Sequence, residues 1–181
     1  MVEIKGGKFI TPQFFDAMHS CFENIVLPSG MRFHDMTDCA FSHCGKNQAD
    51  LRGLSIESSS FELCELTGVM LNDVRVKRST FFDCHMEKSV MNRSEYAECE
   101  FINCYFDDAD ILKGSFQSCT FIHCEFMDAY FYGANMTDCC LDQFSMESLR
   151  ASKTKNYDGI NYEVRASEEG DVLYVERHAF A

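Results

Sequence analysis

The chain has 181 residues, of which 46% are hydrophobic, and a formal net charge of −13. This length suits one domain with a packed core, and the acidic composition without a basic stripe excludes DNA or RNA as ligands. No apolar run reaches the length of a membrane span, and no charged and then apolar leader opens the chain, so neither a transmembrane helix nor a signal peptide is predicted.

Residues 1–28 are predicted to form an N-terminal cap, with a short strand over residues 1–10 and a helix near 12–23. Thr11 is a typical N-cap residue, and Pro12 suits the first helical position. Apolar residues then follow at helical spacing: Phe14, Phe15, Met18, Cys21 and Phe22. This helix is expected either to cover the open end of the following segment or to bind a partner.

Residues 29–150 carry a repeat of five residues. From Met36 to Met146, a large apolar residue stands at every position ending in 1 or 6, except Lys46, and most residues two places earlier are small. A period of five fits neither an α-helix nor a flat strand. It is typical of a solenoid, in which each unit buries its apolar residue only by stacking on the next.

The repeat also has a period of twenty, so that four fives make one square coil. Lys46 cannot be buried unpaired, so its corner is expected to bulge outward. Two columns show the longer period: Phe41, Phe61, Phe81, Phe101, Phe121 and Leu141 in one, and Cys44, Cys64, Cys84, Cys104 and Cys124 in the other. This spacing predicts in-register stacking of about six coils.

This pattern resembles the pentapeptide-repeat family, whose motif is a small residue, Asp or Asn, Leu or Phe, and two mostly polar positions. Ala49-Asp50-Leu51, Ala109-Asp110-Ile111 and Ala134-Asn135-Met136 match it closely, and many other units carry Cys-x-Phe. The resemblance implies an all-β fold, a right-handed quadrilateral parallel β-helix. Six coils at the ~4.8 Å spacing of stacked strands would form a rod roughly 29 Å long.

Nine of the eleven cysteines occupy the small inward position of the repeat. Free cysteine behaves as a small, well-buried hydrophobe, so these thiols are expected to fill the core. Stacked Cβ atoms at ~4.8 Å would be too far apart for disulfides, whose mean is ~3.8 Å. So many reduced thiols favour a cytoplasmic location. Cys140, beside Cys139, is expected to point outward, where it is open to reaction.

The last segment, residues 151–181, is predicted to be a C-terminal cap. Tyr162 to Arg165 and Val172 to Glu176 are β-branched or aromatic runs, and the turn-forming residues 167–170 separate them. This is the pattern of a β-hairpin, which would cover the end of the solenoid or pack along one side.

In the twenty-residue frame, six acidic residues are predicted to lie on one side of the rod: Glu87, Asp107, Asp108, Glu125, Asp128 and Glu147. Such a face attracts basic partners and steers their approach. The alternative interpretation is a solvated face that keeps a β-rich rod soluble.

A second outward column is apolar and consists of Phe82, Ile102 and Ile122. Three large apolar residues in line on a surface indicate that something covers them. The C-terminal hairpin is the favoured candidate, and a dimer contact or a partner protein are the alternatives.

The sequence shows no catalytic motif, no metal-ligand spacing among its histidines and no phosphate-binding loop, so a non-enzymatic protein without metal or cofactor is expected. Some pentapeptide-repeat proteins imitate B-DNA and bind DNA gyrase, which they protect from quinolones or toxins. The resemblance therefore implies a protein-binding rod, with gyrase or another topoisomerase as the partner. The alternatives are an interaction scaffold, including a secreted bacterial effector, and a structural domain of a longer enzyme whose chemistry lies elsewhere.

Overall fold

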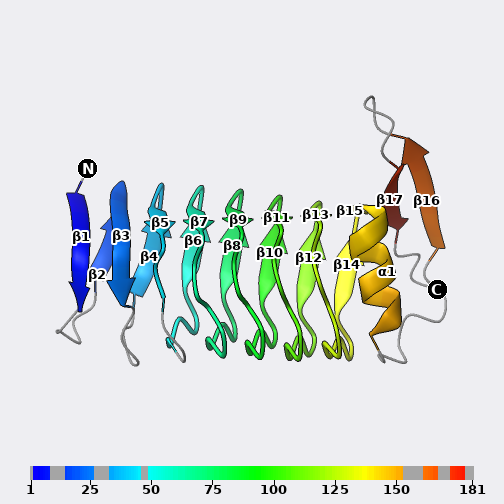
Figure 1. The fold of residues 1–181 in the computed structure, drawn as a ribbon, viewed down its shortest axis with the longest axis horizontal. Helices are drawn as coiled ribbons and strands as arrows, with labels where there is room; N and C mark the ends of the chain where they lie inside the picture. Colours follow the sequence, from blue (N-terminus) through cyan, green and yellow to red (C-terminus); the bar gives the residue numbers. More distant parts are fainter. Residues whose placement is uncertain are drawn as a thin grey trace.

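Two parallel sheets run along the length of the molecule and form two neighbouring sides of a solenoid (Figure 1). The computed structural model describes residues 2–8, 15–26, 33–45, 49–152, 161–166 and 172–177, and the side chains within 19–26, 35–45 and 49–152. In Figure 1 the coils stack from β1 at one end to the helix and hairpin at the other.

The first sheet has seven strands in the order β14-β12-β10-β8-β6-β4-β2 and is called side 1 below. Every pairing within it is parallel, and its regular coils pair residues twenty positions apart, as at Tyr96 and Phe116. Its strands are β2 (Phe15–Met18), β4 (Phe33–Thr37), β6 (Ser55–Glu57), β8 (Arg75–Lys77), β10 (Glu95–Ala97), β12 (Ser115–Gln117) and β14 (Asn135–Thr137).

The second sheet, called side 2, has ten strands in the order β1-β3-β5-β7-β9-β11-β13-β15-β17-β16. Eight of them are parallel, and β16 and β17 run antiparallel at the end. Its strands are β1 (Val2–Lys8), β3 (Ser20–Val26), β5 (Ala40–Ser42), β7 (Ser60–Glu62), β9 (Thr80–Phe82), β11 (Glu100–Ile102), β13 (Thr120–Ile122), β15 (Cys139–Leu141), β16 (Asn161–Ala166) and β17 (Val172–Arg177).

The other two sides of each coil are turns joined by single bridges, such as Tyr105 to Glu125 on side 3 and Asp110 to Tyr130 on side 4. The core residues on these sides are Leu66, Met86, Phe106 and Phe126 on side 3, and Leu51, Leu71, Met91, Ile111 and Phe131 on side 4. The predicted four-sided coil with a period of twenty residues is therefore confirmed.

The core is a set of ladders in which each side chain packs on the residue one coil away. On side 2 the rings of Phe61, Phe81 and Phe101 stack with centroids 4.8 and 4.9 Å apart. Rings from neighbouring sides meet edge to face, as Phe101 and Phe106 do at 5.5 Å. These geometries are the favourable ones for aromatic pairs, so the core has both order along the rod and packing across it.

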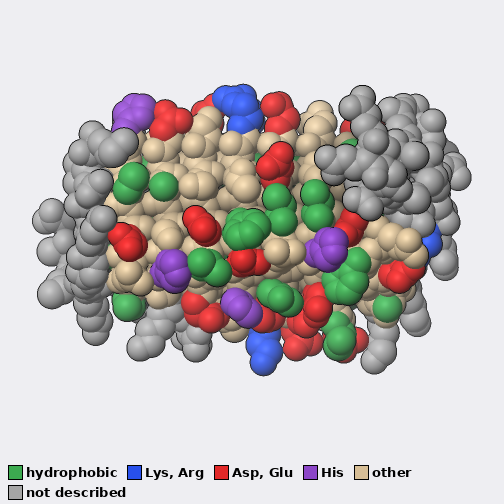
Figure 2. Space-filling model, turned by 45° about the horizontal axis from the view of Figure 1, so that its top comes forward, with side chains coloured by type: hydrophobic (Ala, Val, Ile, Leu, Met, Phe, Trp, Pro, Cys, Tyr) green, Lys and Arg blue, Asp and Glu red, His purple; other side chains and the backbone are tan. Residues whose placement is uncertain are grey.

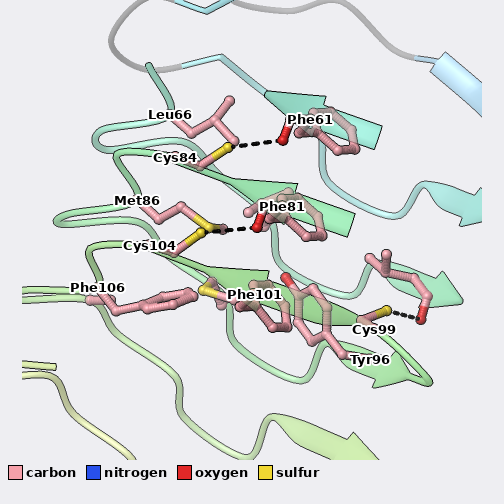
Figure 3. Packing of buried hydrophobic residues seen from close by; sticks show 14 of the residues in the cluster. Phe61, Leu66, Phe81, Cys84, Met86, Tyr96, Cys99, Phe101, Cys104 and Phe106 are labelled. Atoms are coloured by element: carbon pink, nitrogen blue, oxygen red, sulfur yellow. Dashed lines mark hydrogen bonds between the residues drawn. The ribbon is translucent and has the colours of Figure 1, made fainter. Parts of the chain in front are cut away.

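The inward cysteines form a second kind of ladder, and their thiols donate hydrogen bonds to the backbone. The Sγ of Cys84 donates to the carbonyl of Phe61 at 3.4 Å, and the Sγ of Cys104 donates to that of Phe81 at 3.4 Å (Figure 3). All eleven cysteines are free thiols, and the nine at the inward position are buried. The prediction that these nine fill the core is confirmed.

The corners of the coils place one residue in five in the left-handed backbone region. The φ angles of Leu63, Asp108 and Asp128 are +51°, +57° and +54°, and nineteen non-glycine residues of the described part of the chain have positive φ. Asp and Asn tolerate this region better than other non-glycine residues. The repeat therefore favours Asp at its corners for reasons of backbone conformation alone.

The N-terminal helix predicted over 12–23 is wrong where the structure describes it, because Phe15–Met18 and Ser20–Val26 are strands. Phe22 pairs with Phe41, and their rings stack at 4.6 Å, so β3 adds one more coil to the Phe ladder. This coil is one residue shorter than twenty, which hid it from the repeat frame. The corner at Lys46 lies outside the described residues.

A helix, α1 (Gln143–Ala151), ends the repeat where the sequence predicted further repeats up to Arg150. Its N-cap is Asp142, whose Oδ1 accepts a hydrogen bond from the Ser145 N–H at 2.8 Å. Met146 and Leu149 are buried and close the open end of the core. Helical hydrogen bonding is internal, so a helix can end a solenoid without leaving another unpaired edge.

The predicted C-terminal hairpin is confirmed, since β16 and β17 pair antiparallel. Strand β17 also pairs with β15, joining Cys140 to Val175, so the hairpin extends the edge of side 2. The expectation that it covers the apolar column is wrong for Phe82, which remains 37% exposed and lies on β9, several strands from β17. The reason is that an unpaired sheet edge needs hydrogen-bond partners more than the outer face needs covering.

Candidate functional site

The outward residues of side 3 bring several carboxylates together in consecutive coils. Asp107 lies within electrostatic range of Glu87, Asp108 and Asp128. Partial burial of the Asp107 carboxyl raises its pKa, and the three neighbouring carboxylates raise it further. A single opposing effect is the hydrogen bond that Oδ1 of Asp107 accepts from the Met127 N–H at 2.8 Å. These four residues are called the acidic cluster below.

Glu87 of the acidic cluster makes polar contacts with two neighbouring side chains, His85 in its own coil and Thr67 in the preceding coil. The Nδ1 of His85 lies 3.0 Å from Oε1 of Glu87, and the hydroxyl of Thr67 donates to Oε2 of Glu87 at 3.2 Å. The hydrogen bond with Glu87 raises the pKa of His85, and the nearby charge of Glu65 adds to this effect. The His85 ring also stacks on Tyr105, with centroids 5.0 Å apart.

Two of the six predicted acidic residues lie beside the acidic cluster rather than within it. Glu125 stands on side 3, where its backbone forms a β-bridge with Tyr105 of the preceding coil. Glu147 stands on α1 and accepts a hydrogen bond from Nε2 of Gln143 at 2.8 Å. Since Ser148 of this helix accepts a hydrogen bond from the Phe126 N–H at 2.7 Å, α1 meets side 3 at the end of the rod.

The negative charge is concentrated in the later coils. Residues 86–125 contain eight acids and three bases, a net charge of −5, whereas residues 46–85 contain six acids and five bases, a net charge of −1. In the earlier coils several acids are also paired with arginine. Asp73, for example, accepts bidentate bonds from Arg93 at 2.7 and 2.8 Å.

The predicted apolar column lies on the outer face of side 2. Phe82, Ile102 and Ile122 are paired in register on β9, β11 and β13, which are neighbours in the sheet. Phe82 is exposed, and the two isoleucines are half-buried. Leu63 lies at the adjoining corner, where its N–H donates to the carbonyl of Phe82 at 2.9 Å, and it is 42% exposed. Figure 2 shows hydrophobic side chains in the middle of this face with acidic ones around them.

Comparison with known families identifies the repeat. The family model described as pentapeptide repeats matches residues 115–147, with eight copies. The five-residue repeat of this chain is therefore a pentapeptide repeat. Comparison of the sequence with curated proteins finds no match.

Two solved structures share the fold of this chain. Both are trypsin-treated forms of QnrB1, a plasmid-mediated fluoroquinolone resistance protein. One is 17% identical with a TM-score of 0.53, covering 76% of this chain and 79% of that chain. The other is 13% identical with a TM-score of 0.51, covering 87% of this chain and 92% of that chain. At these identities the likeness is one of fold.

The sequence-based prediction missed three exposed residues of the pentapeptide-repeat rod. Met127, Tyr130 and Tyr132 are 62%, 51% and 53% exposed, and the two tyrosine rings stack with centroids 6.2 Å apart. All three stand at outward positions of the five-residue frame, next to the core residues Phe126 and Phe131. The sequence signal was therefore present, as large apolar residues at outward positions.

Within the part of the chain that the structure describes, no group of three or more His, Cys, Asp or Glu side chains has the geometry to hold a metal ion. The described residues also include no helix long and apolar enough to cross a membrane. What the outer surface of the rod offers chemically is therefore charge, exposed rings and an apolar column.

Proposed function

We propose that this pentapeptide-repeat protein is a non-enzymatic protein-binding module, and that its acidic side takes the place of DNA on a DNA-binding protein such as DNA gyrase. The observation that carries the proposal is the acidic cluster, in which Glu87, Asp107, Asp108 and Asp128 lie together across consecutive coils. The fold shared with a fluoroquinolone resistance protein supports gyrase as the first partner to test.

The charge density of the later coils supports DNA mimicry. Two coils rise about 9.6 Å at the ~4.8 Å spacing of stacked strands. The net charge of −5 over residues 86–125 thus amounts to about one charge per 2 Å of rod, close to the roughly 1.7 Å per charge of duplex DNA. The preceding two coils carry only −1, so a basic partner is expected to dock on the later coils.

Backbone conformation accounts for only part of the acidic cluster. Asp108 and Asp128 stand at corners with positive φ, where Asp is favoured without any partner. Asp107 and Glu87 do not stand at corners, and the raised pKa of Asp107 shows that its charge is held at a cost to the fold. The hydrogen bond from Met127 would also be accepted by an amide, so a role in binding explains why an ionisable carboxyl stands at position 107.

The test is a supercoiling assay with purified bacterial gyrase, titrated with this protein in the presence and absence of a fluoroquinolone. Inhibition of gyrase or its protection from the drug is expected. The double variant Asp107→Asn, Asp108→Asn should weaken this effect roughly tenfold or more, because the basic surface of the partner then faces two fewer carboxylates. The effect should also decline steeply as salt rises, since exposed charges are screened beyond ~10 Å at 0.1 M.

The chain offers a matched control of equal charge in the same coil. Glu98→Asn, Glu100→Gln also removes two charges, but Glu98 stands at the corner between sides 1 and 2, and Glu100 lies on β11 of side 2. This variant should retain the activity. Equal loss in both double variants would mean that only net charge matters, and no effect of the wild-type protein well above the gyrase concentration would exclude gyrase as the partner.

The second candidate function is an interaction scaffold that uses the apolar column. The exposure of Phe82 and of Leu63 beside it favours this alternative. A scaffold of this kind should lose its partner in Phe82→Ser or Ile102→Ser, with little dependence on salt. A pull-down with the wild-type protein and these variants distinguishes it from the DNA mimic, and sedimentation of the same variants tests a homodimer through this column.

A further inference from the structure

Among the described residues, the most exposed large hydrophobic side chains stand in the last complete coil and are called the patch below. Met127 lies on side 3, and Tyr130 and Tyr132 flank the buried Phe131 on side 4. Each is more than half exposed, and the tyrosine rings are nearly parallel, at an angle of 10°. Large apolar groups held this far out of the core contribute little to folding, so they are available to a partner.

Carboxylates of the preceding coil lie beside this patch. The Met127 N–H donates to Oδ1 of Asp107 at 2.8 Å, and the Met127 carbonyl accepts from the Asp108 N–H at 2.9 Å. The backbone of Tyr130 forms a β-bridge with that of Asp110 on side 4. Asp128 stands between Met127 and Tyr130 at the corner that joins the two sides. The patch and the acidic cluster therefore share one corner of the rod.

This pairing of chemistry selects one kind of ligand group. A guanidinium is planar, so it stacks on an aromatic face while its edge donates to carboxylates, and a lysine ammonium cannot do both in the same way. Tyr and Met are also enriched in the cores of protein interfaces, because they supply a large contact area beside polar groups.

We propose that Met127, Tyr130 and Tyr132, with the neighbouring carboxylates, bind an arginine-bearing segment of a protein partner. This inference rests on the proposed function in that it assumes a protein partner with a basic surface, and it adds that arginine rather than lysine is recognised. The occupant follows from charge complementarity, since Asp107 and Asp108 are hydrogen-bonded to the backbone of Met127. Asp128 stands at the corner between Met127 and Tyr130, and Asp110 pairs with Tyr130.

The experiment uses two unstructured peptides of equal length, one with three arginines and one with three lysines at the same positions in a Gly/Ser background. Each is titrated into the ¹⁵N-labelled protein of 181 residues at two salt concentrations. The arginine peptide is expected to bind about fivefold more tightly, with amide shifts concentrated at residues 107–110 and 127–132. The variant Tyr130→Leu, Tyr132→Leu keeps all charges and should remove this preference.

The matched control is Phe82→Leu, which removes another exposed aromatic ring, on side 2, and should leave the arginine preference unchanged. Equal affinity for the two peptides, shifts centred elsewhere, or an unchanged preference in the tyrosine variant would each overturn the proposal, as would no binding of either peptide.

The gyrase assay separates this inference from the proposed function. If the Asp107→Asn, Asp108→Asn variant loses gyrase inhibition and the tyrosine variant keeps it, the DNA mimic stands and the arginine patch is overturned. If the arginine preference is seen without any effect on gyrase, the patch stands and the partner is a different protein.

Discussion

The backbone N–H of Met127 donates a hydrogen bond of 2.8 Å to Oδ1 of Asp107, so a carboxylate of one coil holds the backbone of the next. The same carboxyl has a raised pKa, because of its partial burial and its neighbours Glu87, Asp108 and Asp128. Asp107 therefore contributes a hydrogen bond that favours the fold and a charge that opposes it.

The substitution Asp107→Asn separates these two effects, because the amide oxygen can still accept from Met127. The charge destabilises the folded state above the ordinary pKa of 3.8, and stability falls as pH rises from that value through the raised pKa. We expect the variant to gain up to roughly 0.5 kcal/mol at pH 7, measured by urea unfolding. The gain should vanish at pH 3, and a loss of stability at pH 7 would contradict this account.

The pair of His85 and Glu87 predicts that the stability of the fold depends on pH near neutrality. Because Glu87 raises the pKa of His85 above 6.5, the pair stabilises the fold below pH 6.5, and this contribution is lost as pH rises through the raised pKa. Glu87→Gln should lower the pKa of His85, as followed by NMR of its imidazole protons. Glu65→Gln is the control with a smaller shift, and an unchanged pKa in Glu87→Gln would refute the assignment.

Phe101 and Phe82 offer a matched comparison of core and surface on neighbouring strands. Phe101 is fully buried between the rings of Phe81 and Phe121, whereas Phe82 is 37% exposed. Phe101→Ala should cost about 3–5 kcal/mol by leaving a cavity, and Phe82→Ala less than about 1 kcal/mol. Chemical unfolding of both variants measures the difference, and similar costs would argue against the ladder as the main source of stability.

Tyr96 is fully buried, and its hydroxyl has no hydrogen-bond partner among the described residues. Its ring stacks on Phe116 with centroids 5.0 Å apart. Tyr96→Phe removes the unsatisfied hydroxyl and keeps the ring, so it should stabilise the protein by about 1 kcal/mol. The reverse change in the same column, Phe116→Tyr, should destabilise it, and thermal melting of the pair shows whether the signs are opposite.

The buried thiols should be inert in the folded protein. Burial raises the pKa of Cys44 to about 11, and the neighbouring Cys139 together with burial raises that of Cys119 to about 12. Only Cys21 and Cys140, which are half-buried, are expected to react with a thiol reagent at pH 8, because the thiolate is the reactive form. Counting labelled cysteines by mass spectrometry with and without guanidinium tests this, and more than two rapid reactions in the native state would contradict it.

The candidate site was only partly predictable from the sequence. The twenty-residue frame placed Glu87, Asp107, Asp108 and Asp128 together, because the columns of a regular coil follow directly from the repeat. The frame could not show that Asp108 and Asp128 stand at corners with positive φ. This backbone conformation is a second reason for aspartate at these two positions. It also left out Met127, Tyr130 and Tyr132, whose importance depends on their exposure.

Between Leu51 and Leu141 the sequence by itself determined the coil, its register and its core, since an apolar residue in one repeat can be buried only by its equivalent one coil away. The ends of the rod were decided by the tertiary structure alone. There the last coil has no equivalent neighbour, so α1 closes the core at Met146 and Leu149, and β17 pairs with the free edge of β15. At the other end, Phe22 joins the ladder through a coil shorter by one residue, because stacking on Phe41 outweighs the local helical pattern.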